Sequence, residues 1–353
     1  MKQLKVSILP KKRFNKILIR GTNWIGDAIM TLPAVASIRA TYPQAHIAML
    51  AKPLVVDIYK TFSDLDEIII YENKFDHSTG VFALARILRD KKFEAAILLQ
   101  NAIEAAIIAL AARIPVRAGY DSDARGLLLS HSVRRTKAIR KVHQVDYYLE
   151  MVKALGCVPV DQEMHLEDRI NLSEVQQILK KFIPDPQKAV IGIAPGATYG
   201  PAKKWFPERF AAVAGRLSEK FSAQVILMGG KADAETAREV QRLAGKEFIN
   251  LCGMTSVREA VYLISQCRLF ISNDSGLMHV AGALNVPTVA IFGSTNPVTT
   301  APAGRKSVIV HHEVPCSPCL KKECPSDFRC MELISVEDVL KAASKLLEEK
   351  HEH

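Results

Sequence analysis

The sequence predicts an α/β protein made of two doubly wound domains, each with a parallel sheet covered by helices on both faces. The first observation is length, because 353 residues exceed what one ordinary hydrophobic core holds. The second is alternation, because apolar runs of strand length are followed repeatedly by helical patterns, which is the wiring of a parallel sheet. The third is a composition of 48% hydrophobic and 24% charged residues, which is typical of a globular protein.

The first half of the chain contains one series of these elements. Apolar runs predict strands at residues 16–20, 45–50, 67–71 and 95–100. Apolar positions at helical spacing predict helices at residues 28–40 and 103–113. We therefore predict a first domain over residues 1–170.

A second series follows the polar, proline-bearing stretch 161–188. Its predicted strands are residues 189–194, 223–228, 248–251, 269–272 and 288–292. Its predicted helices are residues 207–221, 232–244, 257–265 and 275–284. We predict a second domain over residues 171–334, a cleft between the two domains, and a closing segment, 335–353, whose helix packs back on the first domain.

The formal net charge of +10 predicts an anionic partner, which is nucleic acid, an acidic bilayer surface or a phosphorylated substrate. Nucleic acid is the least favoured, because the sequence has no zinc-finger spacing, aromatic ribonucleoprotein motif or recognition helix. The most apolar stretch, residues 95–112, contains Gln100, Asn101 and Glu104, so no segment is predicted to span a bilayer. Seven cysteines and an N-terminus without a secretory signal predict a cytoplasmic protein with peripheral membrane contact at most.

The strand predicted at 269–272 ends at Asn273 and leads at once into a helix that starts near Ser275. Such a junction presents free backbone N–H groups and the positive end of the helix dipole, which together bind phosphate. In the alternative interpretation, Asp274 or Ser275 only caps the helix and His279 is an interior imidazole. This stretch is the first candidate ligand site.

The loop after the strand predicted at 189–194 is the second candidate. It contains Gly196, Thr198 and Lys203 at the carboxyl end of the strand, where a lysine is well placed to neutralise phosphate. The alternative is a solvated lysine. Neither domain has a Gly-x-Gly-x-x-Gly motif after its first strand and no Walker loop is present, so a dinucleotide redox cofactor is disfavoured.

Asp27 follows the opening strand and is predicted to face the cleft. A carboxylate at this place is suited to act as a general base that takes the proton of an attacking hydroxyl. The alternative is that Asp27 caps the helix that follows it. Neither candidate phosphate-binding segment contains an Asp-x-Asp motif of the kind that holds a divalent ion, so no cofactor is predicted to be required.

Four cysteines gather near the C-terminus, namely Cys316, Cys319, Cys324 and Cys330. The C-x-x-C spacing of the first pair is typical of a structural zinc site. The intervals to the other two cysteines are short, so free or reversibly paired thiols are the alternative.

Four motifs occur in order along the chain, at residues 26–33, 196–205, 254–256 and 273–279. Together they resemble glycosyltransferase family 9, which includes the bacterial lipopolysaccharide heptosyltransferases. The resemblance extends from about Lys16 to the end of the chain. Residues 99–101, residues 117–120 and the cysteine segment resemble the second heptosyltransferase of inner-core assembly more than the first.

The resemblance implies a GT-B fold, in which the first domain binds the acceptor and the second binds the nucleotide sugar. The implied reaction is inverting transfer of L-glycero-D-manno-heptose from ADP-heptose to a heptosylated Kdo2-lipid A, an anionic glycolipid at the cytoplasmic face of the inner membrane. Asp27 matches the family's base. The positions that match donor contacts are Thr198, Lys203, Met254, Asp274, Ser275, Gly276 and His279. The acidic donor contact expected after Gly230 is either Asp233 or Glu235.

Lys203 and the backbone N–H groups around residues 275–277 would compensate the charge on the departing diphosphate. The candidate acceptor contacts are Asn101, Arg140 and His143. The basic segment 134–143 is suited to an anionic acceptor or membrane surface, with a solvated charged face as the alternative. Two other functions stay open: a different GT-B enzyme, such as another heptosyl or hexosyl transferase or an epimerase, and a non-catalytic nucleotide-sugar-binding protein.

Overall fold

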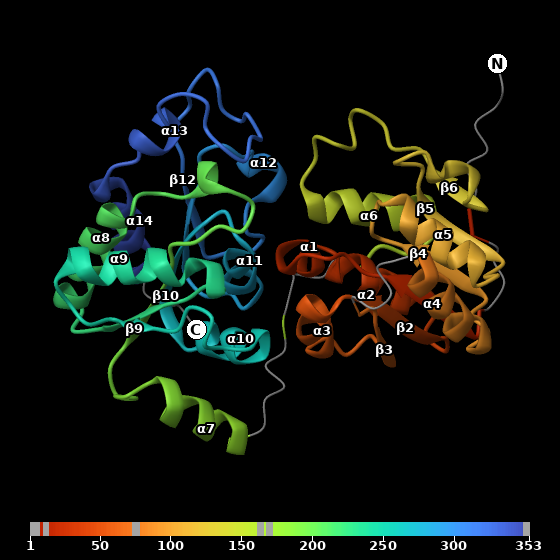
Figure 1. The fold of residues 1–353 in the computed structure, drawn as a ribbon, viewed down its shortest axis with the longest axis horizontal. Coiled ribbons are helices and arrows are strands. Elements are labelled where there is room, and N and C mark those ends of the chain that lie inside the picture. The colour runs from red at the N-terminus through yellow and green to blue at the C-terminus, as the bar shows by residue number, and fades with distance from the viewer. Residues whose placement is uncertain (1–7, 10–13, 73–77, 161–165, 167–171, 349–353) are drawn as a thin grey trace. The chain divides into compact units, whose positions relative to one another are not determined.

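The computed structural model describes residues 8–9, 14–72, 78–160, 166 and 172–348. These residues belong to two compact units, one within 1–162 and the other within 163–353 (Figure 1). Each unit is built on a six-stranded parallel sheet, so the predicted α/β class with two parallel sheets is confirmed. The division falls before residue 170, where the sequence analysis placed it.

The strands of the first unit are β1 (Lys16–Arg20), β2 (His46–Ala51), β3 (Glu67–Ile70), β4 (Ala95–Leu98), β5 (Val116–Tyr120) and β6 (His131–Val133). They pair in the order β3-β2-β1-β4-β5-β6, and every pair is parallel. The chain thus moves outward from β1 to β3 and then crosses to β4, on the other side of β1. The carboxyl ends of β1 and β4 flank the switch point where doubly wound sheets bind ligands.

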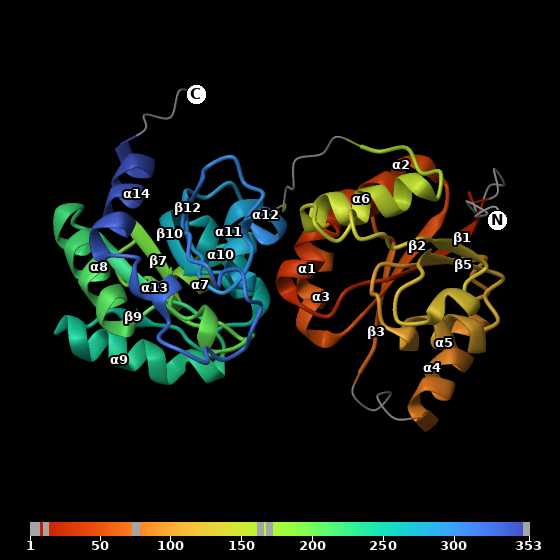
Figure 2. The same ribbon diagram turned by 90° about the horizontal axis from the view of Figure 1, so that it is seen from above.

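The helices of the first unit are α1 (Ile25–Met30), α2 (Leu32–Thr41), α3 (Pro53–Lys60), α4 (Ser78–Asp90), α5 (Ile103–Ala111) and α6 (Gln144–Ala154), with a 3-10 turn, η2 (Arg125–Leu127). α4 and α5 cover one face of the sheet, and α2 and α6 pack together on the other (Figure 2). The helix predicted at 28–40 is two helices, because Pro33 in the first turn of α2 has no N–H to continue the bonding of α1.

The strands of the second unit are β7 (Val190–Ala194), β8 (Gln224–Leu227), β9 (Ile249–Asn250), β10 (Cys267–Asn273), β11 (Thr288–Ile291) and β12 (Ser307–Val310). Their order, β12-β11-β10-β7-β8-β9, repeats the connections of the first sheet. β7 and β10 therefore flank the second switch point. β12, like β5 and β6, was not predicted.

The helices of the second unit are α7 (Leu172–Phe182), α8 (Pro207–Lys220), α9 (Ala234–Ala244), α10 (Val257–Ser265), α11 (Gly276–Ala283), α12 (Pro297–Thr300), α13 (Arg329–Glu332) and α14 (Val336–Glu348), with 3-10 turns η3 (Pro201–Lys203) and η4 (Lys231–Asp233). In the part of the chain that the structure describes, none of the helices combines the length and the hydrophobicity needed to cross a membrane.

The closing helix α14 belongs to the core of the second unit. It buries Val339 and Ala343 in the cluster that also holds Trp205 and Phe210, and it contacts β10, β11, β12 and α8. Trp205 packs edge-on against Phe210 with ring centroids 5.0 Å apart, so it is a packing anchor. The prediction that the closing helix packs on the first domain is therefore corrected, because its apolar stripe is buried within the second unit.

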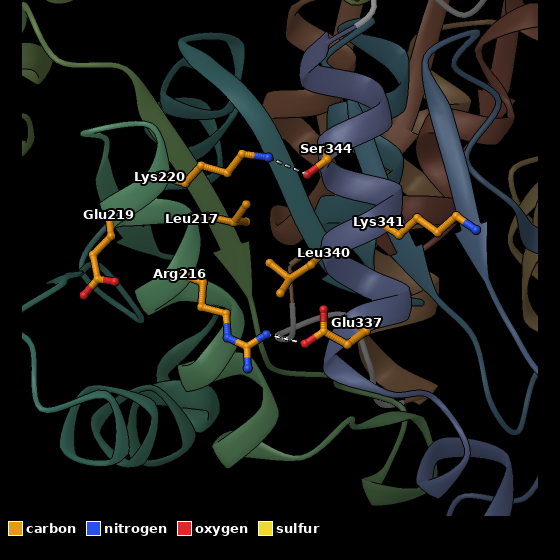
Figure 3. A pocket seen from close by; sticks show the side chains of 8 residues that line it. All are labelled: Arg216, Leu217, Glu219, Lys220, Glu337, Leu340, Lys341 and Ser344. Carbon is orange, nitrogen blue, oxygen red and sulfur yellow. Dashed lines mark hydrogen bonds and ion pairs between the residues drawn. The ribbon is translucent and has the colours of Figure 1, made fainter.

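A groove runs between the last turns of α8 and the first turns of α14 (Figure 3). Arg216 pairs with Glu337 across it, and Lys220 Nζ donates to Ser344 Oγ at 3.3 Å. α8 begins with Pro207 just beyond the carboxyl edge of β7, so its last turns lie toward the opposite edge of the sheet. The groove is thus a charged seam between two packed helices, away from the edge where ligands bind.

Candidate functional site

The switch point of the second unit brings the two predicted phosphate-binding segments together. β7 and β10 pair in the middle of the sheet, with Ile193 opposite Ile271 and Ala194 opposite Ser272. The loop that follows β7 and the turn that follows β10 therefore leave the same edge of the sheet side by side.

Asn273, the last residue of β10, ties these two segments together. It is fully buried. Its Nδ2 donates to Pro195 O at 2.8 Å and to Gly196 O at 3.3 Å, and its Oδ1 accepts from Trp205 N at 3.0 Å. One side chain thus holds both ends of the loop 195–205. The sequence analysis placed Asn273 at the end of the strand but did not assign it this role.

Lys203 and Asp274 form a nearly buried ion pair at this edge. Lys203 Nζ lies 2.6 Å from Asp274 Oδ2, and only 15% and 5% of the two side chains are exposed. Thr295 Oγ1 donates to the same carboxylate oxygen at 2.7 Å. The interpretation of Lys203 as a solvated surface lysine therefore does not hold, because its ammonium group is positioned by a buried carboxylate.

The start of α11 lies beside this ion pair. Ser275 is the N-cap residue, but its side chain makes no capping bond and instead pairs with Ser272 Oγ at 2.9 Å. Asp274 directs its Oδ2 to Lys203 and Thr295. The interpretation in which Ser275 caps the helix is thus not observed, and the N–H groups of the first turn of α11 have no cap from this side chain.

The structure distinguishes between the two candidates for the acidic contact after Gly230. Asp233 is buried, accepts from Gly230 N at 3.0 Å and lies 3.9 Å from Lys204 Nζ. A side chain at Gly196 would overlap the Asp233 carboxyl group, so the two residues are in direct contact. Glu235 is instead exposed and pairs with Arg238 at 2.5 Å. Asp233 is therefore the acidic residue at the ligand-binding edge.

The other predicted donor contacts lie on segments that leave the same edge. Thr198 is exposed on the loop after β7. Met254 is 62% exposed and follows Gly253, whose positive φ of 73° suits glycine and whose N–H donates to Gly229 O at 2.9 Å. His279 is buried one turn into α11. The structure thus places these side chains at the edge, and their contacts with a ligand stay predictions.

The cysteine-bearing segment between β12 and α13 packs on the loops around the ion pair. Leu320 N donates to Ser294 O at 2.9 Å, and Ser317 Oγ donates to Gly293 O at 2.6 Å. On the side of the β7 loop, Tyr199 Oη donates to Leu320 O at 2.8 Å and Ala202 N donates to Lys322 O at 3.0 Å. The segment therefore supports the 3-10 turn that carries Lys203.

The four thiols of this segment are free. Burial raises the pKa of Cys330, and charge on Cys316, Cys324 and Cys319 raises it further, so the four sulfurs lie in one neighbourhood. Hydrogen bonding, first from the Ser326 main chain, lowers the pKa of Cys324. Across the described residues, no group of three or more His, Cys, Asp or Glu side chains is arranged to hold a metal ion, and zinc binding by the four thiols stays a prediction.

In the first unit, Asp27 lies on α1, just after the carboxyl edge of β1. It is the third residue of the helix, and the N-cap is Trp24, so the interpretation of Asp27 as the cap does not hold. The loop before it is organised by Arg20, which donates to Gly21 O at 2.6 Å and to Asn23 Oδ1 at 3.0 Å. Asp27 also acts on buried Tyr148, whose pKa is raised by burial and then by the carboxylate charge.

The three predicted acceptor contacts differ in their surroundings. Asn101, just after β4, accepts at Oδ1 from Tyr147 Oη at 3.0 Å and from Ser122 Oγ at 3.2 Å. His143 is the N-cap of α6, and its Nδ1 accepts from Val145 N at 3.2 Å, a structural role that the sequence analysis did not consider. Arg140 is exposed. Asn101 therefore shares the carboxyl edge of the sheet with Asp27.

A buried arginine that the sequence analysis missed supports this edge. Arg125 is fully buried and donates to the carbonyls of Gln100, Tyr120 (2.7 Å) and Leu98 (3.3 Å). Burial lowers its pKa to about 10. Its bonds join the chain just before Asn101 to the end of β5, and no local pattern in the sequence marks it.

The family model for glycosyltransferase family 9 (heptosyltransferase) matches residues 81–328 of this chain. The chain belongs to glycosyltransferase family 9. A family 9 relative, the lipooligosaccharide heptosyltransferase 2 of Haemophilus ducreyi, is 32% identical over 84% of this chain and 88% of its own length. The lipooligosaccharide heptosyltransferase 2 of Campylobacter jejuni is 29% identical, and the match covers 95% of this chain and 99% of the relative.

A solved family 9 structure, the ADP-heptose LPS heptosyltransferase II of Escherichia coli, superposes with a TM-score of 0.80 at 28% identity, covering 94% of this chain and 98% of that one. The resemblance found in the sequence is therefore confirmed, and so are the GT-B fold and the assignment as a glycosyltransferase.

Proposed function

We propose that this family 9 enzyme transfers L-glycero-D-manno-heptose from ADP-heptose to the heptosyl-Kdo2-lipid A inner core of lipopolysaccharide. One observation carries the proposal: a positioned lysine, Lys203, lies beside the open start of α11 at the switch point of the second unit. The relatives named as heptosyltransferases 2, and the solved enzyme named for ADP-heptose, support the choice of sugar and of nucleotide.

The second unit supplies what the departing ADP requires. Negative charge builds on the diphosphate as the glycosidic bond breaks, and a preorganised cation with helix-start N–H groups stabilises that charge. Lys203 supplies the cation, and the first turn from Gly276 supplies the N–H groups. Asp274, which itself accepts from Thr295, holds Lys203 in place before the donor arrives, so little reorganisation accompanies the reaction.

The remaining donor contacts surround this centre. We assign Asp233 to the donor hydroxyls, because it is the one of the two acidic candidates after Gly230 that lies at this edge, and a carboxylate accepts hydrogen bonds from a diol. Thr198, Ser275 and His279 are assigned to the diphosphate and sugar, and Met254, an exposed apolar side chain, to the nucleobase.

The first unit supplies the base. The acceptor oxygen bonds to the anomeric carbon of heptose while its proton passes to the Asp27 carboxylate, and the bond from that carbon to the phosphate oxygen breaks with its electron pair on ADP. A single displacement of this kind inverts the anomeric centre. Asn101, Arg140 and His143 are assigned to the anionic acceptor.

The test is acceptor-dependent ADP release. Purified protein is incubated with ADP-heptose and a heptosyl-Kdo2 acceptor, and ADP and product mass are followed. Asp27→Asn should retain ADP-heptose binding and lose about a hundredfold or more in turnover. The matched control is Asp57→Asn, an acid of the same unit that pairs with Lys60 at 3.3 Å, and it should leave turnover unchanged.

Three results would contradict the proposal. Turnover that survives Asp27→Asn favours a protein that only binds nucleotide sugars. Release of nucleotide from UDP-sugars in preference to ADP-heptose favours another GT-B activity. Absence of acceptor-dependent release overturns the assignment of the acceptor.

A further inference from the structure

Helix α5 of the first unit is apolar at every position except Glu104. Ala105, Ala106, Ile108 and Ala109 are buried against the sheet. Ile103, Ile107 and Leu110 occur at positions i, i+4 and i+7, form a stripe on the opposite side and are exposed. A helix with apolar side chains on opposite sides is normally covered on both, so we expect a partner to cover this outer stripe.

Helix α4 lies beside α5 and extends this surface. Both views show the two helices next to each other on one face of the sheet (Figures 1 and 2), and Arg89 Nη2 donates to Ala111 O at 2.6 Å. Phe82 on α4 is 66% exposed. We call Phe82 and Arg86 of α4, with Ile103, Ile107 and Leu110 of α5, the α4–α5 face. Exposed apolar side chains grouped on neighbouring helices, unlike scattered ones, mark an interaction surface.

The charges around this face indicate which kind of surface it binds. The exposed charged residues on α4 and in the turn after α5 are Arg86, Arg89, Arg113 and Asp90, three cations against one anion. The acid of α5, Glu104, accepts from Tyr71 Oη. Arginines around apolar side chains suit an anionic lipid surface, whereas two copies of this face would bring like charges together.

The face also has a suitable position within its unit. α5 begins at Ile103, two residues after Asn101, so the exposed stripe starts at the same edge of the sheet as Asp27. A glycolipid acceptor has its sugars next to the lipid headgroups. A bilayer that contacts the start of α5 would therefore present those sugars at the edge that carries the proposed base.

We propose that the α4–α5 face docks on an anionic phospholipid bilayer, with Phe82, Ile103, Ile107 and Leu110 in the interfacial layer and the arginines on the headgroups. This inference rests on the proposed function for its purpose, the delivery of a lipid acceptor. It names a surface other than the basic segment 134–143 that the sequence analysis considered.

The experiment is co-sedimentation of the full chain with vesicles of phosphatidylcholine and phosphatidylglycerol in equal parts, and with phosphatidylcholine alone. The wild type should partition to the anionic vesicles, and less so at high salt. Ile107→Glu and Phe82→Glu should each lower the partition coefficient about tenfold, since a charge replaces an inserted apolar group. Arg86→Glu should lower it to a smaller extent.

The matched control is Leu243→Glu on α9, which adds the same charge at an exposed leucine of the second unit and should leave partition unchanged. Ile107→Ser, which adds no charge, guards against a nonspecific effect and should show an intermediate loss. Wild type that stays in the supernatant, or equal loss for Ile107→Glu and Leu243→Glu, overturns the inference. A wild-type dimer in light scattering that Ile107→Glu dissociates would show that a second copy covers the face.

Activity separates this inference from the proposed function. Ile107→Glu should release ADP at the wild-type rate with a delipidated acceptor and more slowly with the acceptor in vesicles. Vesicle binding without any transfer would overturn the proposed function and leave the docking surface standing. Transfer to the delipidated acceptor without vesicle binding would overturn the docking surface and leave the proposed function standing.

Discussion

Asn273 shows how one side chain organises the donor edge. Its side chain bonds to main-chain atoms of the loop 195–205, which is separated from it by about seventy positions in sequence. Because the amide is fully buried, each of these main-chain groups would lose its partner without a replacement from water. The placement of Lys203 therefore depends on a residue that need not touch the ligand.

We predict that Asn273→Ala lowers the free energy of unfolding by about 2–4 kcal/mol, since it leaves buried polar groups without partners. It should also raise the KM for ADP-heptose, because the loop with Thr198 and Lys203 loses both anchors. Urea unfolding and donor titration measure the two effects. Gln266→Ala is the control, because Gln266 is an exposed amide whose Nε2 donates to the neighbouring Ser265 Oγ at 3.1 Å. Equal effects of the two variants would contradict the assignment.

At the scale of elements, α14 is held by a reciprocal cap at its first turn. Ser335 N and Oγ donate to Asp338 Oδ2 at 2.9 and 2.8 Å, and Asp338 N donates to Ser335 Oγ at 3.1 Å. These bonds, first that from Ser335 N, lower the pKa of Asp338 below its ordinary value. A carboxylate with a depressed pKa in the folded state stabilises the fold above its unfolded pKa, and the stabilisation is lost as the pH falls through the folded value.

We predict that Asp338→Ala lowers the free energy of unfolding by about 1 kcal/mol at neutral pH, the usual contribution of a cap. The difference from the wild type should shrink as the pH falls through the depressed pKa of Asp338, because the wild-type carboxylate is then protonated. Denaturant unfolding over a pH series measures it. Glu337→Ala, which removes only an exposed ion pair with Arg216, should cost little at any pH. A pH-independent difference for Asp338→Ala would contradict the role of its charge.

At the scale of the whole molecule, the chain uses one strand order twice. Both sheets place a crossover after their third strand, so each unit has its own switch point and its own buried core. The residues assigned to the donor belong to the second unit, and the base belongs to the first. Donor recognition is therefore expected to be a property of the second unit.

We predict that ADP slows amide hydrogen exchange at residues 195–205, 229–233 and 273–279 and leaves the strands of the first unit unchanged. Ligand binding suppresses the local opening of the segments that contact it. Mass spectrometry of amide hydrogen exchange, with and without ADP, measures this protection. Lys203→Ala should abolish the protection at the same ADP concentration, whereas Lys220→Ala on the far end of α8 should retain it. Protection of equal size in residues 16–133 would contradict the assignment.

Burial distinguishes some of the predicted strands from those that were not predicted. All five residues of β7 are buried, so both faces of the strand require apolar side chains and the run is easily recognised. β6, an edge strand, has no fully buried residue, and β12, the edge of the second sheet, has only one. Burial is not the whole difference, because the edge strands β3 and β9 were predicted, whereas β5, which lies inside its sheet, was missed.

The sequence alone determined the class of fold, the two repeated series of strands, the family, and the segments that carry Asp27, Lys203 and Asp274, because these depend on local patterns and on the order of motifs. Only the tertiary structure decided which side chains meet. It selected Asp233 over Glu235, added Asn273 and Thr295 to the donor edge, and placed α14 in the second core. Contacts of this kind join residues far apart in the chain, and they exist only once the parallel strands align their carboxyl ends at a common edge.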